Sequence, residues 1–503
     1  MLAALAASTV FTLVYAWFAA NNRYAEKVLV PLLDVLQSVP ILGYLSITVT
    51  GFIALFPGSL LGLQFAVIFA VWTSQAWNMT FSLYQSLKTV PRDLGEAATL
   101  YRLGAWQRFW KLELPYAAPG LLWNAMMSMS GGWFFVVAAE ALTVSGQQVS
   151  VPGIGSYIAA AIAAKNLGAI GWAILAMVAV ILLYDTLLFR PIVAWADKFR
   201  LDNTVSVDAP RSFVLDFLRR TRLTQRLSRI PAVLWELSVR LLPPVPRDKP
   251  LARKQPVWAD RMFYLLVALL SAGLLGALFF VLPRDFGWPQ VGHVLLLGLI
   301  TAFKVFALVA LSALIWVPVG IWIGLRPRWA AVAQPVAQFL AAFPANLLFP
   351  LVVVAIVHWH LSVNVFTAPL MILGSQWYIL FSVIGGASAL PGDLREAGRN
   401  LGLRGWLLWR RLYLPAVFPA FVTGALTASG GAWNASIVAE VVSWGSHTLV
   451  ATGLGAYITE ATQTGQTLKV GLGVGVMALY VIAINRLVWH RLYEIAATRV
   501  RLD

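Results

Sequence analysis

Apolar segments long enough to cross a lipid bilayer occupy most of the chain. A helix needs roughly 20 predominantly apolar residues to span the hydrocarbon core. Eleven segments of this kind lie near residues 3–20, 28–56 (interrupted at Pro40), 59–86, 117–142, 168–188, 262–282, 296–325, 332–357, 364–388, 417–442 and 468–488. With 60% hydrophobic and 12% charged residues, the chain has too little polar surface to enclose a soluble core. The sequence therefore predicts an all-α polytopic membrane protein with about 11 transmembrane helices.

Basic residues orient these segments. The formal net charge of +16 would suit nucleic acid, but Lys and Arg cluster in the short loops at one end of the spans. By the positive-inside bias, these loops are cytoplasmic and the N-terminus lies outside. The residues on that side are Arg23, Lys27, Lys88, Arg92, Lys198, Arg200, Arg326, Arg328, Arg491 and Arg499. The chain contains no cysteine, which excludes a disulfide framework and thiolate chemistry.

A gapless internal repeat organises the chain. Residues 91–158 recur as 391–458, and the identities include Glu96 with Glu396 and Pro115 with Pro415. Both copies carry a polar stretch on the basic side of the membrane, so the repeats run in parallel. Parallel repeats related by an axis along the membrane normal enclose a central pathway. This organisation predicts a transport protein.

The domain prediction follows from the repeat: a first repeat over 1–190, a basic linker over 191–260 and a second repeat over 261–503. The first repeat has no partner for the segment 262–282, so we expect it to lack one N-terminal helix. Residues 3–20 also fit a secretory signal, but they lack a basic start, and "PLLDVLQSVP" after them aligns with "PVAQFLAAFP" in the second repeat.

The linker has apolar pairs at helical spacing among arginines. Phe213 pairs with Phe217 and Leu223 with Leu227, while Arg219, Arg220, Arg222, Arg226 and Arg229 lie between and around them. The pattern predicts an amphipathic helix on the anionic cytoplasmic leaflet. The alternative is a plain tether between two repeats.

The polar stretches read "EAATLYRLGAWQRFWKLELP" from Glu96 and "EAGRNLGLRGWLLWRRLYLP" from Glu396. Asp93 and Asp393 are predicted N-caps, with the Glu at the third helical position as in a capping box. We expect breaks near Gly104 and Gly402, and Pro115 and Pro415 should mark the turn into the next span. A short, capped helix at the cytoplasmic surface is suited to transmitting motion to another protein.

These residues resemble the EAA motif of permease subunits of bacterial binding-protein-dependent ABC importers. In that family the motif is a coupling helix that inserts into a groove on an ATP-hydrolysing subunit. Two copies imply a fused permease in the bacterial cytoplasmic (inner) membrane, with a type I importer transmembrane domain in each repeat. The resemblance assigns ATPase coupling to Asp93, Glu96, Ala97, Gly104, Asp393, Glu396, Ala397 and Gly402.

The first copy departs from the motif. The family glycine falls six residues after the Glu, where Gly402 satisfies it but Arg102 stands in the first copy. The second copy has Gly398 in place of the second alanine. We therefore expect the two coupling helices to dock unequally or to prefer different ATPase chains.

The segments "VAAEALT" and "AWNASIVAE" are most similar to nitrate, sulfonate, taurine and bicarbonate permeases. That likeness implies alternating-access import of a small anion, two ATP-binding cassette subunits at the cytoplasmic face and an extracytoplasmic solute-binding protein. The dipeptide Gly-Lys never occurs, so the chain has no P-loop. We expect a permease that is not itself an enzyme, with ATP and Mg²⁺ held by the partner subunits and no cofactor in this chain.

Polar groups at membrane depth are candidates for the translocation path, because each is costly in lipid. The residues selected are Gln75, Asn78, Trp133, Gln376, Trp433, Asn434 and Ser436. The competing interpretation is that they serve helix packing and the interfacial belt. Glu140 and Glu440 lie near the outer surface, where a carboxylate would repel an anion. We expect a gating or structural role for them, through pairing with a base or with backbone amides.

Other functions have weaker support. A secondary transporter or channel without ATPase partners would use ionisable groups deep in the spans, for which Lys304 and Asp185 are the main candidates. His358 and His360 have no thiol or carboxylate nearby, so we predict no metal site. No His-rich or Asp-rich catalytic cluster supports a membrane enzyme.

Overall fold

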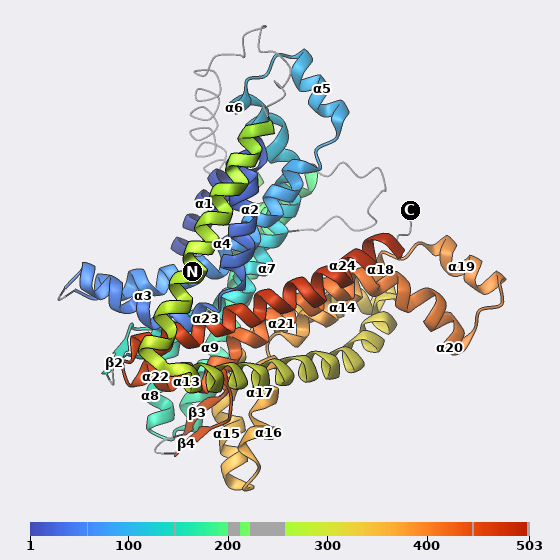
Figure 1. Cartoon of the computed structure of the whole chain (residues 1–503). Coiled ribbons are helices and arrows are strands. Elements are labelled where there is room, and N and C mark those ends of the chain that lie inside the picture. The colour runs from blue at the N-terminus through green and yellow to red at the C-terminus, as the bar shows by residue number, and fades with distance from the viewer. Residues whose placement is uncertain (58, 145–146, 200–211, 222–256, 445–446, 500–503) are drawn as a thin grey trace. The chain divides into compact units, whose positions relative to one another are not determined.

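The computed structural model describes residues 1–57, 59–144, 147–199, 212–221, 257–444 and 447–499 (Figure 1). They belong to two compact units, which are described separately. The first unit comprises Met1–Phe81, Asn124–Asp185 and Leu296–Asp503. The second comprises Ser82–Trp123 and Thr186–Leu295.

The first repeat is a series of helices with one β-hairpin. Its elements are α1 (Leu2–Asn21), α2 (Arg23–Ser38), α3 (Ile41–Leu55), α4 (Leu60–Lys88), α5 (Arg92–Leu100), α6 (Ala105–Arg108), a π-helical turn (Phe109–Glu113), α7 (Leu114–Glu140), β1 (Ala141–Val144), β2 (Gln147–Ser150), α8 (Ile154–Ala163), α9 (Leu167–Tyr184) and a second π-helical turn (Asp185–Phe189). The chain continues through α10 (Arg190–Ala196), a 3₁₀ turn (Asp197–Phe199) and α11 (Phe213–Arg220).

The second repeat has closely matching elements. They are α13 (Val257–Gly324), α14 (Pro327–Ala342), a 3₁₀ turn (Ala345–Leu348), α15 (Phe349–His358), α16 (Val363–Phe366), α17 (Ala368–Ile372), α18 (Gln376–Ser388), α19 (Gly392–Asn400), α20 (Gly405–Leu408), a π-helical turn (Trp409–Tyr413), α21 (Leu414–Ala439), β3 (Val441–Trp444), β4 (His447–Val450), α22 (Leu454–Gln463), α23 (Thr467–Ile484), a π-helical turn (Asn485–Trp489) and α24 (His490–Arg499).

Two antiparallel hairpins add to the helical fold expected from the sequence. In β1–β2, Ala141 lies opposite Ser150, and in β3–β4, Val441 lies opposite Val450. Each hairpin follows the long helix that carries the Gly-Trp segment. Because the two occupy equivalent positions, they extend the internal repeat to β structure that the apolar pattern did not predict.

Seven helical runs in the described residues are long and apolar enough to cross a membrane, or ten spans if each of three bent pairs counts as one. These ten correspond to ten of the eleven expected spans. The remaining segment, 262–282, forms the first part of α13, which continues past Gly287 (φ 68°) to Gly324. The chain is therefore a polytopic helical membrane protein.

Proline has two different effects on the spans. The expected interruption at Pro40 is confirmed, since Pro40 precedes α3 and the two arms meet at 89°. The expected turns at Pro115 and Pro415 are wrong, because both residues lie inside continuous helical runs, Ala105–Glu140 and Gly405–Ala439. A π-helical turn ends two residues before each proline. A wider turn relieves the clash of a proline ring with the preceding helical turn.

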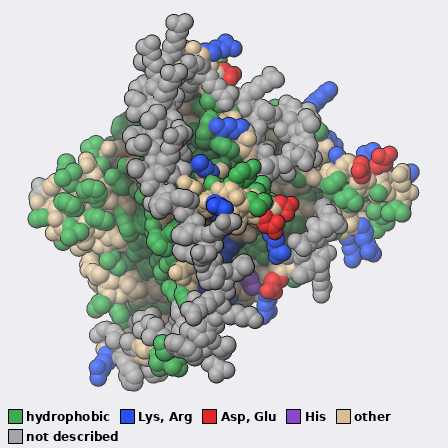
Figure 2. Space-filling model, turned by 90° about the horizontal axis from the view of Figure 1, so that it is seen from above, with side chains coloured by type: hydrophobic (Ala, Val, Ile, Leu, Met, Phe, Trp, Pro, Cys, Tyr) green, Lys and Arg blue, Asp and Glu red, His purple; other side chains and the backbone are tan. Residues whose placement is uncertain are grey.

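Small residues allow close helix packing in the first unit. A Cβ on Gly424 of α21 would lie 2.8 Å from the Tyr378 carbonyl oxygen of α18, and one on Gly324 would lie 2.6 Å from the Ile384 carbonyl oxygen. Glycine is required at such contacts because the helix backbones nearly touch. Large apolar side chains such as Trp172, Phe303 and Leu314 are instead exposed, as expected for lipid-facing positions. Figure 2 shows broad hydrophobic areas on one face, with charged side chains in small groups.

Part of the linker prediction falls on described residues. Phe213 and Phe217 lie one turn apart on α11, and both are exposed. The residues Leu223, Leu227, Arg222, Arg226 and Arg229 lie outside the described ranges. The boundaries at residues 190 and 260 stay a prediction.

Candidate coupling and translocation sites

The two predicted coupling helices begin two residues earlier than expected. Pro91 precedes α5 and Pro391 precedes α19, each in an extended conformation. Asp93 and Asp393 therefore lie inside the first turn, and the capping-box prediction is wrong for both helices. The Pro91 carbonyl already accepts a bond from the Gly95 amide, so helical bonding starts before Asp93. An aspartate in the first turn still interacts favourably with the positive end of the helix.

Both helices end in the same left-handed turn. Arg102 adopts φ 51° and Gly402 adopts φ 74°. The following amides, of Leu103 and Leu403, bond back to the Ala98 and Gly398 carbonyls at 3.0 Å, which completes a Schellman motif in each copy. Arg102, rather than Gly104, is thus the counterpart of Gly402. Gly104 lies two residues on, directly before α6.

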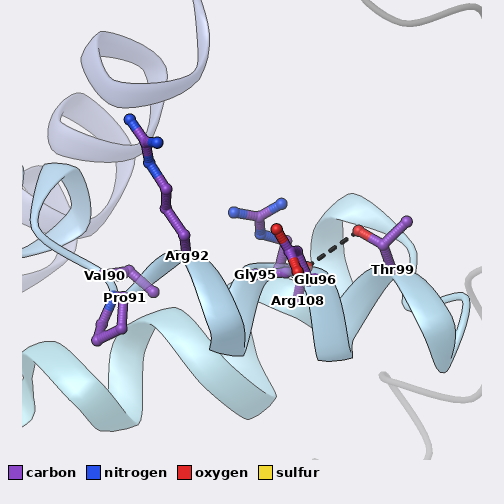
Figure 3. Close-up of a pocket in the computed structure, with 7 residues that line it drawn as sticks. All are labelled: Val90, Pro91, Arg92, Gly95, Glu96, Thr99 and Arg108. Atoms are coloured by element: carbon purple, nitrogen blue, oxygen red, sulfur yellow. Dashed lines mark hydrogen bonds between the residues drawn. The ribbon is translucent and has the colours of Figure 1, made fainter.

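Glu96 lies at the rim of a shallow groove in the second unit (Figure 3). The groove has a volume of about 330 Å³ and is lined by Val90, Pro91, Arg92, Gly95, Glu96, Thr99 and Arg108. Figure 3 shows the Glu96 and Arg108 side chains near each other, while Arg92 points away. Arg108 Nε donates to Glu113 Oε1 at 2.7 Å. Asp93 and Glu96 are exposed and Ala97 is half-buried, so the acidic side chains are available to a partner.

The second coupling helix repeats the backbone with different side chains. Asp393, Glu396 and Ala397 are exposed, as a docking element requires. The groove positions differ, however, with Gly392, Arg395, Arg399 and Leu408 replacing Arg92, Gly95, Thr99 and Arg108. In Figure 1, α19 and α20 project from the ends of α18 and α21. The two helices thus share a shape but not a surface chemistry.

Three of the seven predicted path residues form the shortest hydrogen bonds between helices in this set. Asn78 Nδ2 donates to Ser128 Oγ at 3.0 Å, and Gln376 Oε1 accepts from Trp316 Nε1 at 2.9 Å. Asn434 Oδ1 accepts from the Ile41 amide at 2.7 Å, which joins the second repeat to the bend before α3 in the first. The structure thus places an inter-repeat contact at one of the selected residues.

The remaining path residues are buried or stacked. Ser436 Oγ donates to the Trp433 carbonyl at 2.8 Å, and Trp133 packs edge-on against Tyr184. Gln75 is 0% exposed and Trp433 is 1% exposed. Within the described residues, Gln75 Nε2 and Trp433 Nε1 have no hydrogen-bond partner. These two buried donors are the ones that packing alone does not explain.

Glu440 is the centre of a buried network on the second repeat. It is 1% exposed, and its Oε1 accepts from Lys304 Nζ at 3.0 Å and from Thr301 Oγ1 at 3.1 Å. Its Oε2 accepts from the Ala456 amide at 3.1 Å. Lys304 Nζ also donates to the Thr452 carbonyl at 2.6 Å. The carboxylate therefore connects α13, α21 and the start of α22.

Glu140 has the equivalent position in the first repeat. Its Oε2 accepts from the Gly155 amide at 2.7 Å, at the start of α8. Both carboxylates thus bond backbone amides at a helix start, and Glu440 also pairs with a base. The sequence did not identify Thr301, although its spacing of three residues before Lys304 places both on one helix face and was the available signal.

The comparison with known proteins gives one family match in each repeat. The family described as binding-protein-dependent transport system inner membrane component matches twice, at residues 12–197 and 316–502. The bicarbonate transport system permease protein CmpB of Synechococcus elongatus is 28% identical over 165 residues, which is 33% of this chain and 56% of the relative. The putative aliphatic sulfonates transport permease protein SsuC of Bacillus subtilis is 27% identical over 161 residues, 32% of this chain and 55% of the relative.

A third relative is the nitrate import permease protein NrtB of Leptolyngbya laminosa, which is 27% identical over 113 residues, 22% of this chain and 38% of that protein. The chain spans about half the length of the CmpB and SsuC relatives that it matches. The two family matches together cover more than half of the chain. This chain is therefore a multi-pass inner membrane protein and belongs to the binding-protein-dependent transport system inner membrane components, with two copies of the family domain fused in tandem.

Proposed function

We propose that the chain is the permease of an ATP-driven importer and moves a small anionic solute into the cytoplasm by alternating access. The observation that carries this proposal is the pair of exposed helices, α5 and α19. Each begins after a proline, ends in a Schellman motif and is followed closely by a helical run of membrane-spanning length. A short, fixed helix joined in this way to a spanning helix is suited to transmitting force.

The energy source lies outside the chain. Two ATP-binding cassette subunits would each hold ATP and Mg²⁺ and grip one coupling helix. An extracytoplasmic binding protein would deliver the solute to the opposite face. Closure of the ATPases on nucleotide would then switch access at the contact between the repeats, where Asn434 bonds the Ile41 amide.

The anionic solute class rests on the relatives, whose names specify bicarbonate, nitrate and aliphatic sulfonates. The arrangement of charged side chains near the outer surface supports an anionic solute. The buried Glu440 carboxylate is compensated by Lys304, so it presents no free negative charge to an approaching anion. This compensation supports import of an anion through the second repeat.

Reconstitution of the complete transporter in proteoliposomes tests the proposal. Glu96→Gln with Glu396→Gln should leave ATP hydrolysis by the associated ATPases measurable while solute uptake falls to background. A matched control is Glu494→Gln on α24, an exposed carboxylate that pairs with exposed His490. Uptake that persists in the double variant, or uptake by the chain without any ATPase, would favour a secondary transporter instead.

A further inference from the structure

Six buried polar atoms in the first unit have no hydrogen-bond partner within the described residues, and three of them, Gln75 Nε2, Ser375 Oγ and Trp433 Nε1, lie on or beside the Gly-Trp segments of the long helices. Their side chains are 0%, 7% and 1% exposed. A buried polar group without a partner is costly, and each such group in a native protein requires a reason. In a transport protein, one reason is a ligand that is absent from this conformation.

Gln75 and Ser375 occupy similar places in the two repeats. The recurring segments "SQAWN" and "SQWY" begin at Ser74 and Ser375, so Gln75 lies one residue after the position that matches Ser375. Gln75 lies 13 residues before the end of α4 at Lys88, and Ser375 immediately precedes the 13-residue helix α18. At 1.5 Å per residue, each lies about 20 Å from the cytoplasmic end of its helix, inside the hydrocarbon layer of about 30 Å. Two polar groups, one from each repeat, therefore occupy the same depth.

Glycines bring both groups against the following long helix. A Cβ on Gly132 of α7 would lie 3.1 Å from Gln75 Nε2, and one on Gly431 of α21 would lie 3.2 Å from Ser375 Oγ. The Met1 side chain also contacts Gly132. Trp433 follows Gly431 by two residues. The donors thus gather along the Gly-Trp segments of α7 and α21.

A fourth polar group, a hydroxyl of the second repeat, lies close to a helix of the first repeat. Tyr378 Oη, from α18, lies 3.5 Å from the point that a Cβ on Gly131 would occupy. Among the described atoms, it is the only non-neighbouring one within 4 Å of that point. Tyr378 and Gln75 therefore approach consecutive residues of α7 from opposite repeats, and the space beside Gly131 has a hydroxyl at its edge.

The chemistry of this set selects one class of solute. The amide, hydroxyl, phenol and indole groups all donate hydrogen bonds, and the indole donates only. None of the four residues carries a charge. Uncharged donors stabilise an anion without holding it as tightly as a cationic side chain would, which suits a solute that must be released. A quaternary ammonium solute could accept none of these bonds.

We infer that Gln75, Ser375, Tyr378 and Trp433 form an oxyanion-binding site at the contact between the two repeats. This inference rests on the proposed function, because the close approach at Gly132 and Gly431 requires the helices to separate when the solute enters. Alternating access supplies that separation. The site deepens the proposal by naming the groups that recognise the solute.

The test uses the complete transporter in proteoliposomes, with nitrate, bicarbonate and ethanesulfonate as oxyanion probes and tetramethylammonium as a quaternary ammonium probe without a hydrogen-bond acceptor. The variants are Ser375→Ala, Tyr378→Phe and Gln75→Leu. Each should lower uptake of the transported oxyanion by at least about tenfold, the effect of losing one hydrogen bond to a charged group. Ser375→Ala should leave the thermal unfolding midpoint unchanged or higher, because Ser375 Oγ has no hydrogen-bond partner within the described residues. Gln75→Leu also removes the Oε1 atom that accepts from Ser8 Oγ at 3.4 Å, so Ser375→Ala and Tyr378→Phe are the variants that separate solute recognition from stability.

Thr80→Val is the matched control. Thr80 is also buried on α4, but its hydroxyl bonds Thr12 Oγ1 at 3.1 Å. We expect this variant to lower the unfolding midpoint while uptake stays near the wild-type rate. A purely structural role for the four residues would give the reverse result, with lower midpoints and normal uptake.

The failures of the two proposals are distinguishable. ATP-driven uptake that the donor variants do not alter would overturn the oxyanion site and leave the importer intact. Wild-type uptake of tetramethylammonium alone, or of none of the three oxyanions, would also overturn the site. Uptake of an oxyanion without ATP would instead contradict the importer.

Discussion

The two repeats have the same backbone conformation at two matching helix ends. They use different residues at the left-handed position of each. Gly402 and Gly465 adopt positive φ in the second repeat, and Arg102 and Lys165 adopt it at the equivalent places in the first. In all four turns the next amide bonds back to the helix, as in Leu103 to the Ala98 carbonyl. A side chain makes this conformation unfavourable. The comparison teaches that the fold requires the turn, and that the first repeat tolerates strain there.

The outer carboxylates show a second difference. Glu140 bonds a backbone amide, whereas Glu440 bonds an amide, a hydroxyl and the Lys304 ammonium. The second repeat thus has the more extensive buried polar network. We expect it to depend more strongly on single residues in this region than the first repeat does.

The largest effect is expected from Lys304→Met. Removing one partner of a buried ion pair leaves an uncompensated charge and costs about 3–5 kcal/mol. The free energy of unfolding of the purified chain in detergent should fall by that amount, and adding Glu440→Gln should restore part of it. Glu140→Gln in the first repeat should cost only about 1 kcal/mol, because it weakens bonding to one amide. Equal losses would contradict the difference between the repeats.

A smaller effect is expected from alanine at the paired glycines. A Cβ on Gly453 would overlap Glu440 Oε1, and one on Gly153 would overlap the Glu140 carboxyl group. Overpacking of this kind costs about 1–3 kcal/mol. Gly453→Ala should be near the upper end, because the bonds of Glu440 keep it in place, and Gly153→Ala near the lower end. Thermal unfolding of the two variants checks the order, and the opposite order would contradict it.

Glycine in the left-handed turns should stabilise the first repeat. Arg102→Gly and Lys165→Gly should each raise the free energy of unfolding by about 1 kcal/mol, since the side-chain strain is relieved. Thr99→Gly is the control within α5, where glycine should destabilise by about 0.5–1 kcal/mol. A loss of stability in Arg102→Gly would show that the turn is unstrained or that its side chain has another role.

The smallest effect is expected from Glu113→Gln. Its partner Arg108 has a side chain 42% exposed, while that of Glu113 is 10% exposed. Solvent screens such a pair, so the free energy of unfolding should fall by no more than about 1 kcal/mol. The second repeat has Leu408 and Tyr413 at the equivalent positions, so these two residues form no corresponding ion pair. A much larger drop on denaturant titration would indicate that the pair holds the groove together.

The sequence predicted the spans, the repeat and the bend at Pro40 because each depends on local composition or spacing. It placed the helix starts at Asp93 and Asp393 wrongly, since Pro91 and Pro391 occupy the N-cap positions. It also missed the effect of Pro115, because a π-helical turn that accommodates proline leaves no composition signal.

The candidate site was only partly predictable for a related reason. Polarity at membrane depth selected Gln75 and Trp433, but Ser375 and Tyr378 gain their importance from contacts with glycines on a distant helix. The two hairpins were missed because four-residue strands are too short for a clear alternating pattern. Long-range packing, rather than local preference, decides these features.

The central claim is that α5 and α19 both face the cytoplasm and each docks an ATPase subunit. The chain contains no cysteine, so Thr99→Cys and Arg399→Cys each create a single exposed thiol at matched positions. We predict that a membrane-impermeant maleimide labels both in inside-out vesicles and neither in right-side-out vesicles, and that assembly with the ATPase subunits protects both from labelling. Labelling of either thiol from the outside, or no protection of either by the ATPases, would contradict the account.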